Sequence, residues 1–163
     1  MAVSSLKERD DAPNVCLQNQ FSEKVCLKEL QGKWIVFYFY PKDGTSGCKQ
    51  EAVDFSARKE IFEKNDAVIV GVSKDTVASH QKFIEKAELS ISLWADPELT
   101  ANKAFDVWQL KKFMGKENMG TVRTTFLIRP DGKISKIWNN VRVKDHATSV
   151  LEELIDQKNE DKK

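Results

Sequence analysis

The feature that most constrains the fold is the hydrophobic run WIVFYFY at residues 34–40. Its residues are aromatic or aliphatic throughout, which is typical of a strand that is buried on both faces. Pro41 ends the run, because proline lacks the N–H that a strand ladder needs. After this break, apolar residues such as Phe55 and Phe62 recur at helical spacing among charged residues, which predicts a helix over residues 46–64. The sequence therefore predicts a buried strand, a short loop and a helix in this order.

Cys48 lies where this strand has ended and the helix is beginning. Thr45 or Ser46 is a suitable N-cap, which places Cys48 in the first helical turn. A helix N-terminus carries orphan N–H groups and a partial positive charge, so it stabilises a thiolate and lowers the pKa of a cysteine. The local chemistry predicts a nucleophile. The alternative is a buried, inert cysteine, which is a common environment for a free thiol.

The loop before Cys48 carries a motif that is similar to a known active site. The pattern Pro41-x-x-x-Thr45-x-x-Cys48 resembles the active-site motif of peroxiredoxins. The surrounding sequence FYFYPKDGTSGCKQEA, at residues 37–52, most resembles the bacterioferritin-comigratory or Q-type branch of that family. An inert cysteine would leave this combination of proline and threonine unexplained.

A second block of sequence supports the resemblance. It reads KFMG at residues 112–115 and GTVRTTFLI at residues 120–128. In the family, the arginine of this block, Arg123 here, helps to hold the reactive cysteine as a thiolate. The resemblance covers roughly residues 10–155, and the two blocks together are a more specific signal than either alone.

The resemblance implies a role for each residue of the expected site. Cys48 attacks the O–O bond of a peroxide and becomes a sulfenic acid. Arg123 supplies a permanent positive charge and a fixed fork of donors, and Thr45 adds its hydroxyl and the neighbouring N–H groups. Pro41 shapes the loop and shields the sulfenic acid from water. Glu51 matches a glutamate that is common in the family and is a weaker candidate.

The sequence departs from the family pattern after Cys48. Many Q-type members place a resolving cysteine five residues later, but this chain has Val53 there. Either an external thiol reduces the sulfenic acid directly, or Cys16 or Cys26 resolves it. We expect the N-terminal hairpin that carries these two cysteines to lie too far from the site. At strand positions they are expected to be cross-strand neighbours and small apolar fillers.

The alternation of strands and helices predicts an α/β fold with a mixed central sheet flanked by helices. The resemblance sharpens this to a thioredoxin-like fold with an N-terminal β-hairpin. We expect a single domain over residues 1–163, ordered from roughly residue 10 to residue 157, with a mobile or loosely docked segment at residues 1–11. The glycine-containing residues 107–119 are expected to form a loop. The other expected elements are strands at residues 15–18, 25–28, 67–72, 122–128 and 133–138, and a helix at residues 147–155.

Composition and spacing exclude several classes of protein. The formal net charge of +1 gives no general electrostatic reason to bind nucleic acid or an anionic membrane. Residues 1–11 are polar, and three cysteines suit a reducing compartment, so we expect a cytoplasmic protein. There is no Cys-x-x-Cys pair, so we do not expect a thioredoxin-type dithiol exchanger. The cysteine spacing fits no zinc site, so we expect neither metal nor cofactor. His80 and His146 are expected to be surface or capping residues.

The function predicted from these residues is a thiol-specific peroxidase. It would reduce hydrogen peroxide and organic hydroperoxides, with electrons from thioredoxin or another thiol donor, and act as a monomer or, alternatively, a dimer. The other prediction is a redox-sensing or chaperone-like interaction module with a thioredoxin-like fold. The combination of Thr45, Cys48 and Arg123 favours the enzyme, because a sensor needs only the cysteine.

Overall fold

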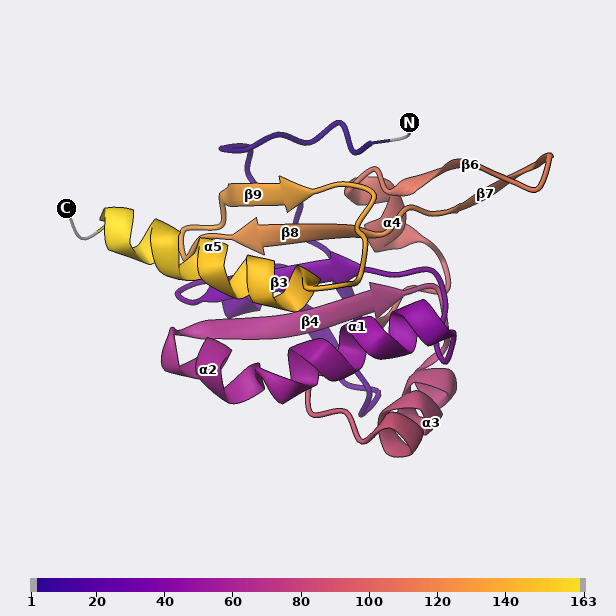
Figure 1. Cartoon of the computed structure of the whole chain (residues 1–163), viewed down its shortest axis with the longest axis horizontal. Coiled ribbons are helices and arrows are strands. Elements are labelled where there is room, and N and C mark those ends of the chain that lie inside the picture. The colour runs from indigo at the N-terminus through magenta and orange to yellow at the C-terminus, as the bar shows by residue number, and fades with distance from the viewer. Residues whose placement is uncertain (1–2, 162–163) are drawn as a thin grey trace.

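The hydrophobic run becomes β3 (Trp34–Phe39), an inner strand of a seven-stranded sheet. The computed structural model describes residues 3–161, apart from the side chain of Phe113. The sheet is mixed, as predicted, and its strand order is β2-β1-β5-β4-β3-β8-β9. Figure 1 shows β4, β3, β8 and β9 side by side in this order. β3 is parallel to β4 and antiparallel to β8. The remaining bounds are β1 (Cys16–Gln18), β2 (Lys24–Cys26), β4 (Ala67–Ser73), β5 (Ser92–Ala95), β8 (Thr124–Ile128) and β9 (Ile134–Trp138).

The helix predicted over residues 46–64 is divided in two. Arg58, with φ −108° and ψ 6°, leaves the helical conformation and separates α1 from α2. The last helix is longer than predicted, because Lys158 donates to the carbonyl of Asn65 and Arg129 pairs with Asp161 at its final turn. The bounds are η1 (Leu27–Leu30), α1 (Ser46–Ala57), α2 (Lys59–Lys64), α3 (Val77–Ala87), α4 (Thr100–Ala104) and α5 (His146–Asp161). Within residues 3–161, no helix combines the length and apolar character needed to cross a membrane.

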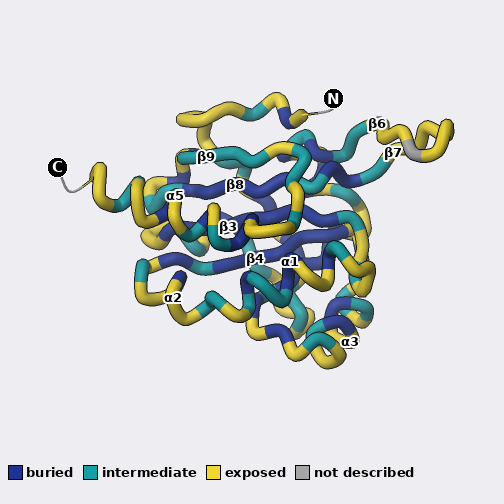
Figure 2. The backbone as a smooth tube through the Cα atoms, viewed as in Figure 1, coloured by how far each residue is buried: buried dark blue, intermediate teal, exposed yellow. Residues whose placement is uncertain are grey.

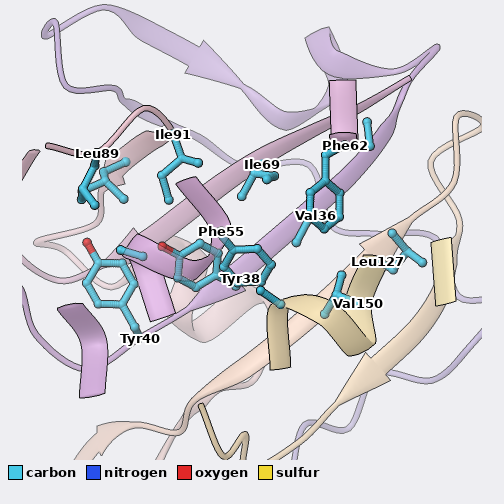
Figure 3. Packing of buried hydrophobic residues seen from close by; sticks show 14 of the residues in the cluster. Val36, Tyr38, Tyr40, Phe55, Phe62, Ile69, Leu89, Ile91, Leu127 and Val150 are labelled. Atoms are coloured by element: carbon cyan, nitrogen blue, oxygen red, sulfur yellow. The ribbon is translucent and has the colours of Figure 1, made fainter. Parts of the chain in front are cut away.

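Alternate residues of β3 pack into two separate cores, one on each face of the sheet. Val36 and Tyr38 face a cluster formed with α1, α2 and α5, which Figure 3 shows around Phe55. Phe37 and Phe39 face the other cluster, formed with α4 and the N-terminal strands. β3 is buried along its whole length (Figure 2), which explains why its sequence is continuously apolar.

The prediction of a loop over residues 107–119 is wrong. The chain there forms a two-stranded hairpin, β6 (Trp108–Phe113) and β7 (Lys116–Thr121), which projects from the body of the protein (Figure 1). Met114 and Gly115 form its two-residue turn with φ values of 51° and 79°. A type I′ turn requires positive φ at both positions, and methionine is an unusual residue for that conformation. The turn was therefore not apparent in the sequence.

The segment before residue 12 is docked more firmly than the sequence predicts. The Ser4 hydroxyl donates to the Phe105 carbonyl at 2.6 Å. The Arg9 N–H donates to the Ile134 carbonyl at 2.8 Å, so the segment lies along β9. Residues 1–2 lie outside the described part of the chain.

The N-terminal hairpin is present as predicted, and it contains a disulfide bond. Cys16 and Cys26 are direct cross-strand partners and are joined to each other. Cys16 is exposed and Cys26 is half-buried, so the prediction that they are apolar fillers is wrong. Their placement on the outer face follows from the inward direction of Leu17, because side chains alternate along a strand.

Candidate active site

Cys48 sits in the first turn of α1, directly after the loop that follows β3. Thr45 is the N-cap residue, with φ −72° and ψ 154°, and its carbonyl accepts the N–H of Lys49 at 2.8 Å. The side chain of Cys48 is buried, with 1% of its surface exposed, and it is a free thiol. The predicted strand, loop and helix therefore place this sulfur at a helix N-terminus.

Arg123 reaches Cys48 because β8 is the neighbour of β3. Thr124, the first residue of β8, pairs with Phe39, the last residue of β3, so Arg123 lies beside the end of β3. Its Nη2 donates to the Sγ of Cys48 at 3.2 Å, and its Nη1 donates to Oε1 of Glu51 at 2.6 Å. The guanidinium thus places a positive charge against the sulfur, and such a contact stabilises the thiolate.

Glu51 is part of this arrangement, three residues after Cys48 on the same face of α1. Its side chain is 1% exposed. Burial raises the pKa of Glu51 to about 7, although the charge and hydrogen bond of Arg123 act in the opposite direction. Burial lowers the pKa of Arg123, but Glu51 and Cys48 raise it by more, so its net shift is upward. The arginine therefore stays charged. Glu51 was only a weak candidate from the sequence resemblance, and the structure places it in direct contact with Arg123.

Tyr38 lies next to these residues and was not predicted as part of the site. Its ring stacks on that of Phe55, with 4.8 Å between the ring centroids. Figure 3 shows the two side chains together in the core. Burial raises the pKa of Tyr38 well above its usual value, and the nearby Glu51 and Cys48 raise it further, so the phenol is neutral. Gly71 on β4 makes room for it, because a Cβ there would lie 2.8 Å from the Tyr38 hydroxyl. Among the described residues, this hydroxyl and Oε2 of Glu51 are buried without a hydrogen-bond partner.

Thr45 and Pro41 lie in the loop before the helix. The Thr45 side chain is exposed, and its hydroxyl donates to the carbonyl of Lys42 at 3.1 Å. This bond closes the loop on itself. Pro41 is half-buried and follows Tyr40, whose N–H donates to the carbonyl of Val72. The structure thus brings Cys48, Glu51 and Arg123 into contact and places Thr45 and Pro41 in the loop that supports them.

The sequence profile of the AhpC/TSA family matches residues 9–137, which include the whole of this arrangement. This chain belongs to the AhpC/TSA family. Peroxiredoxin Bcp of Bacillus subtilis is 49% identical over 145 residues, which cover 89% of this chain and 92% of the relative. Peroxiredoxin Bcp of Escherichia coli K12 is 34% identical over 149 residues, which cover 91% and 96%.

Solved structures of peroxiredoxins have the same fold. A cysteine-to-serine mutant of Xylella fastidiosa peroxiredoxin Q superposes with a TM-score of 0.90 at 34% identity, over 95% of this chain and 99% of that one. The Xanthomonas campestris bacterioferritin comigratory protein, studied for alkyl peroxide reduction in trapped intermediate and ligand complexes, gives a TM-score of 0.86 at 35% identity, with the same coverage. The thioredoxin-like fold and the peroxiredoxin resemblance are confirmed.

In this peroxiredoxin, a buried polar network anchors the loop before Cys48. Oδ1 of Asp43 accepts the Tyr40 hydroxyl at 2.5 Å, and Oδ2 lies 2.7 Å from Nδ1 of His80. Nε2 of His80 lies 3.0 Å from the carbonyl of Trp94, so both ring nitrogens contact oxygen atoms. His80 is fully buried, so its predicted surface or capping role is wrong. It ties the loop to α3 and β5.

His146 is also buried, although the sequence analysis placed it at the surface or at a cap. It is the first residue of α5, and its Nε2 lies 2.8 Å from the hydroxyl of Thr125 on β8. Burial lowers the pKa of His146 to about 4, with a smaller contribution from the charge of Arg123. The imidazole is therefore neutral at pH 7 and adds no positive charge to the peroxiredoxin site.

A groove of about 680 Å³ lies beside Arg123, at the base of the β6–β7 hairpin. Leu110, Lys111, Val122 and Val141 form part of its wall. The Lys111 ammonium donates to the carbonyl of Thr121 at 2.9 Å. Burial lowers the pKa of Lys111, and the nearby charge of Arg123 lowers it further. Cationic and apolar groups thus line the solvent side of the Arg123 guanidinium.

Proposed function

We propose that this peroxiredoxin reduces hydrogen peroxide and organic hydroperoxides with Cys48 as its nucleophile. The observation that carries the proposal is the pair of hydrogen bonds from Arg123, at 3.2 Å to the sulfur of Cys48 and at 2.6 Å to Glu51. Glu51 fixes one nitrogen of the guanidinium, so the other is directed at the sulfur. A preorganised donor of this kind acts strongly in a site from which water is excluded.

The proposed reaction transfers one oxygen atom from the peroxide to Cys48. The thiolate attacks the nearer peroxide oxygen, the O–O bond breaks, and the leaving oxygen takes up a proton to become water or an alcohol. Arg123 stabilises the thiolate before attack and the negative charge that develops on the leaving oxygen. Cys48 becomes a sulfenic acid, the first and reversible step of cysteine oxidation.

Electrons for Cys48 come from an external thiol. One thiol condenses with the sulfenic acid, releasing water and forming a mixed disulfide, and a second thiol attacks that bond and regenerates Cys48. The position one turn beyond Cys48 is Val53, whose side chain packs against the core. Cys16 and Cys26 are bonded to each other. We propose that the external thiol is thioredoxin or a similar donor. We also propose that the enzyme is a monomer and works in a reducing cytoplasm.

Steady-state peroxide consumption with thioredoxin, its reductase and NADPH tests the function, with glutathione as the alternative donor. Cys48→Ser is expected to abolish turnover, because serine is a far weaker nucleophile. Cys16→Ser and Cys26→Ser serve as matched controls and are expected to retain most activity. Turnover by Cys48→Ser would refute the proposal, and oxidation of Cys48 without turnover with any donor would favour the redox-sensing alternative.

A further inference from the structure

We propose that the Cys16–Cys26 disulfide is a second redox site, which accepts two electrons from a protein dithiol and does so independently of Cys48. Neither the peroxidase site nor its chemistry uses this pair. A disulfide in a reducing cytoplasm is usually catalytic or redox-sensing rather than structural. The proposal rests on three features of the hairpin: the exposure of one sulfur-bearing residue, the groove beside it, and the bonds that hold the hairpin without the disulfide.

The two cysteines differ in their access to solvent. Cys16 is exposed, whereas Cys26 is half-buried and precedes the 3₁₀ turn η1. Cys48, in contrast, is 1% exposed and is covered by Arg123. Thiol–disulfide exchange requires direct access of the attacking thiolate to a sulfur atom. Cys16 is therefore the residue at which an external thiol is expected to attack.

A groove of about 610 Å³ opens beside Cys16. β1 pairs with β5 only between Gln18 and Ala95, and beyond this pair the two chains separate. The groove lies between them and is closed at one end by the first residues of α3, with Thr76 and Ala78 in its wall. Its surface is largely apolar, and Lys24, Asp96 and Glu98 add charged groups of both signs to its lining. These features fit the active-site segment of a protein dithiol.

The hairpin does not depend on the disulfide for its shape. The Asn19 side-chain oxygen accepts the N–H groups of Phe21 and Glu23, which fixes the turn. The Asn19 N–H also donates to the Glu23 carbonyl at 3.0 Å, and Leu17 and Leu27 anchor the hairpin in the core. Reduction is thus expected to open the sulfur–sulfur bond and leave the hairpin folded, so the pair is suited to reversible exchange.

The exchange balances as a two-electron transfer. A thiolate of the reductant attacks the sulfur of Cys16, the Cys16–Cys26 bond breaks, and Cys26 leaves as a thiolate that takes up a proton. The second thiol of the reductant then attacks the mixed disulfide and releases Cys16 as a thiol. The reductant leaves as a disulfide, and the peroxiredoxin gains two thiols.

The decisive experiment uses Cys48→Ser, in which the disulfide contains the only two cysteines. The oxidised variant is incubated with reduced thioredoxin in native buffer, alkylated, and weighed by mass spectrometry. We expect two alkyl groups per chain without denaturant. Labelling that appears only after unfolding in urea would overturn the proposal. Because every protein in this experiment lacks Cys48, its result is independent of whether the peroxidase proposal holds.

Two further comparisons test the attacked sulfur and the groove. With Cys48 also replaced by Ser, the Cys26→Ser chain is expected to react with a disulfide reagent about tenfold faster than the Cys16→Ser chain, because only Cys16 is exposed. Equal or reversed rates would overturn attack at Cys16. Ala78→Trp, in the Cys48→Ser background, is expected to slow reduction by thioredoxin but not by dithiothreitol, since it fills the groove. Equal slowing of both, or of neither, would overturn docking in the groove.

Discussion

At the scale of single residues, the chemistry depends on one arginine that contacts two groups on the same helix. Arg123 binds the sulfur of Cys48 through one nitrogen and the carboxylate of Glu51 through the other. Arginine suits this position because its planar fork holds two partners in fixed geometry, which the single ammonium of lysine does not reproduce. The positive charge near the sulfur is therefore both permanent and oriented.

Replacement of Arg123 should make Cys48 less reactive at neutral pH. We expect Arg123→Ala to slow alkylation of the native protein by iodoacetamide at pH 7 by about tenfold or more, since a nearby cation favours the reactive thiolate. Arg129→Ala is the matched control, because Arg129 pairs with Asp161 at the far end of β8. An unchanged alkylation rate in Arg123→Ala would show that the guanidinium does not activate the sulfur.

His146 makes stability depend on pH in a defined window. Its pKa is lowered from 6.5 to about 4, so the unfolded chain takes up this proton at a higher pH than the folded chain. The resulting stabilisation is complete above pH 6.5 and is lost as the pH falls towards 4. Relative to His146→Gln, the wild-type free energy of unfolding should fall by up to about 3 kcal/mol across this window. Urea unfolding at several pH values measures it.

In this comparison the carboxyl of Glu51, whose pKa is raised to about 7, is present in both proteins, so its titration cancels. A constant difference in the free energy of unfolding between wild type and His146→Gln from pH 7 to pH 4 would contradict the account.

Sequence alone did not reveal the burial of either His80 or His146, because a histidine within a helical pattern gives no signal of its depth. Cys48 and Arg123 were predictable because they belong to specific motifs.

At the scale of elements, the loop before Cys48 is held by α3 through a buried network. Asp43 in the loop accepts from Tyr40 and from Ser79 of α3, and His80 bridges the same carboxylate to β5. Loops are usually the more mobile parts of a fold. Here, buried hydrogen bonds fix the loop that sets the start of α1, and thus the position of the nucleophile.

Loss of the His80 side chain should therefore destabilise the protein and loosen this loop. His80→Ala leaves the Asp43 side chain buried with one hydrogen-bond partner fewer, which typically costs about 1–3 kcal/mol. We also expect faster amide hydrogen exchange at residues 43–47. Lys82→Ala, at an exposed position of the same helix, should change stability by less than about 0.5 kcal/mol. Equal stabilities for the two variants would contradict the anchoring role.

Most elements could be predicted from periodicity, but two could not. The break at Arg58 has no proline or glycine to mark it, so the sequence pattern continues through it. The β6–β7 hairpin turns at Met114-Gly115, and the methionine in a left-handed conformation conceals the turn. In both places local propensity gave no signal, and tertiary structure determines the conformation.

At the scale of the whole molecule, the order of strands in the sheet creates the site. Cys48 and Arg123 are 75 residues apart in sequence, and they meet because β8 inserts beside β3 in the antiparallel direction. Periodicity alone predicted only an α/β fold. The proximity of Arg123 to Cys48 was predicted from the family resemblance. Cys16 and Cys26 were correctly predicted as cross-strand neighbours, but spacing cannot indicate whether such neighbours are bonded.

The absence of a local resolving thiol at Val53 leads to the central claim, that Cys48 alone is oxidised by peroxide. The chain, with its Cys16–Cys26 bond intact, is treated with one equivalent of peroxide and a sulfenic-acid reagent, then analysed by peptide mass spectrometry. The account predicts the reagent on Cys48 and an unchanged Cys16–Cys26 bond, with sulfinic acid at Cys48 when peroxide is in excess. A stoichiometric disulfide between Cys48 and either Cys16 or Cys26 would contradict it.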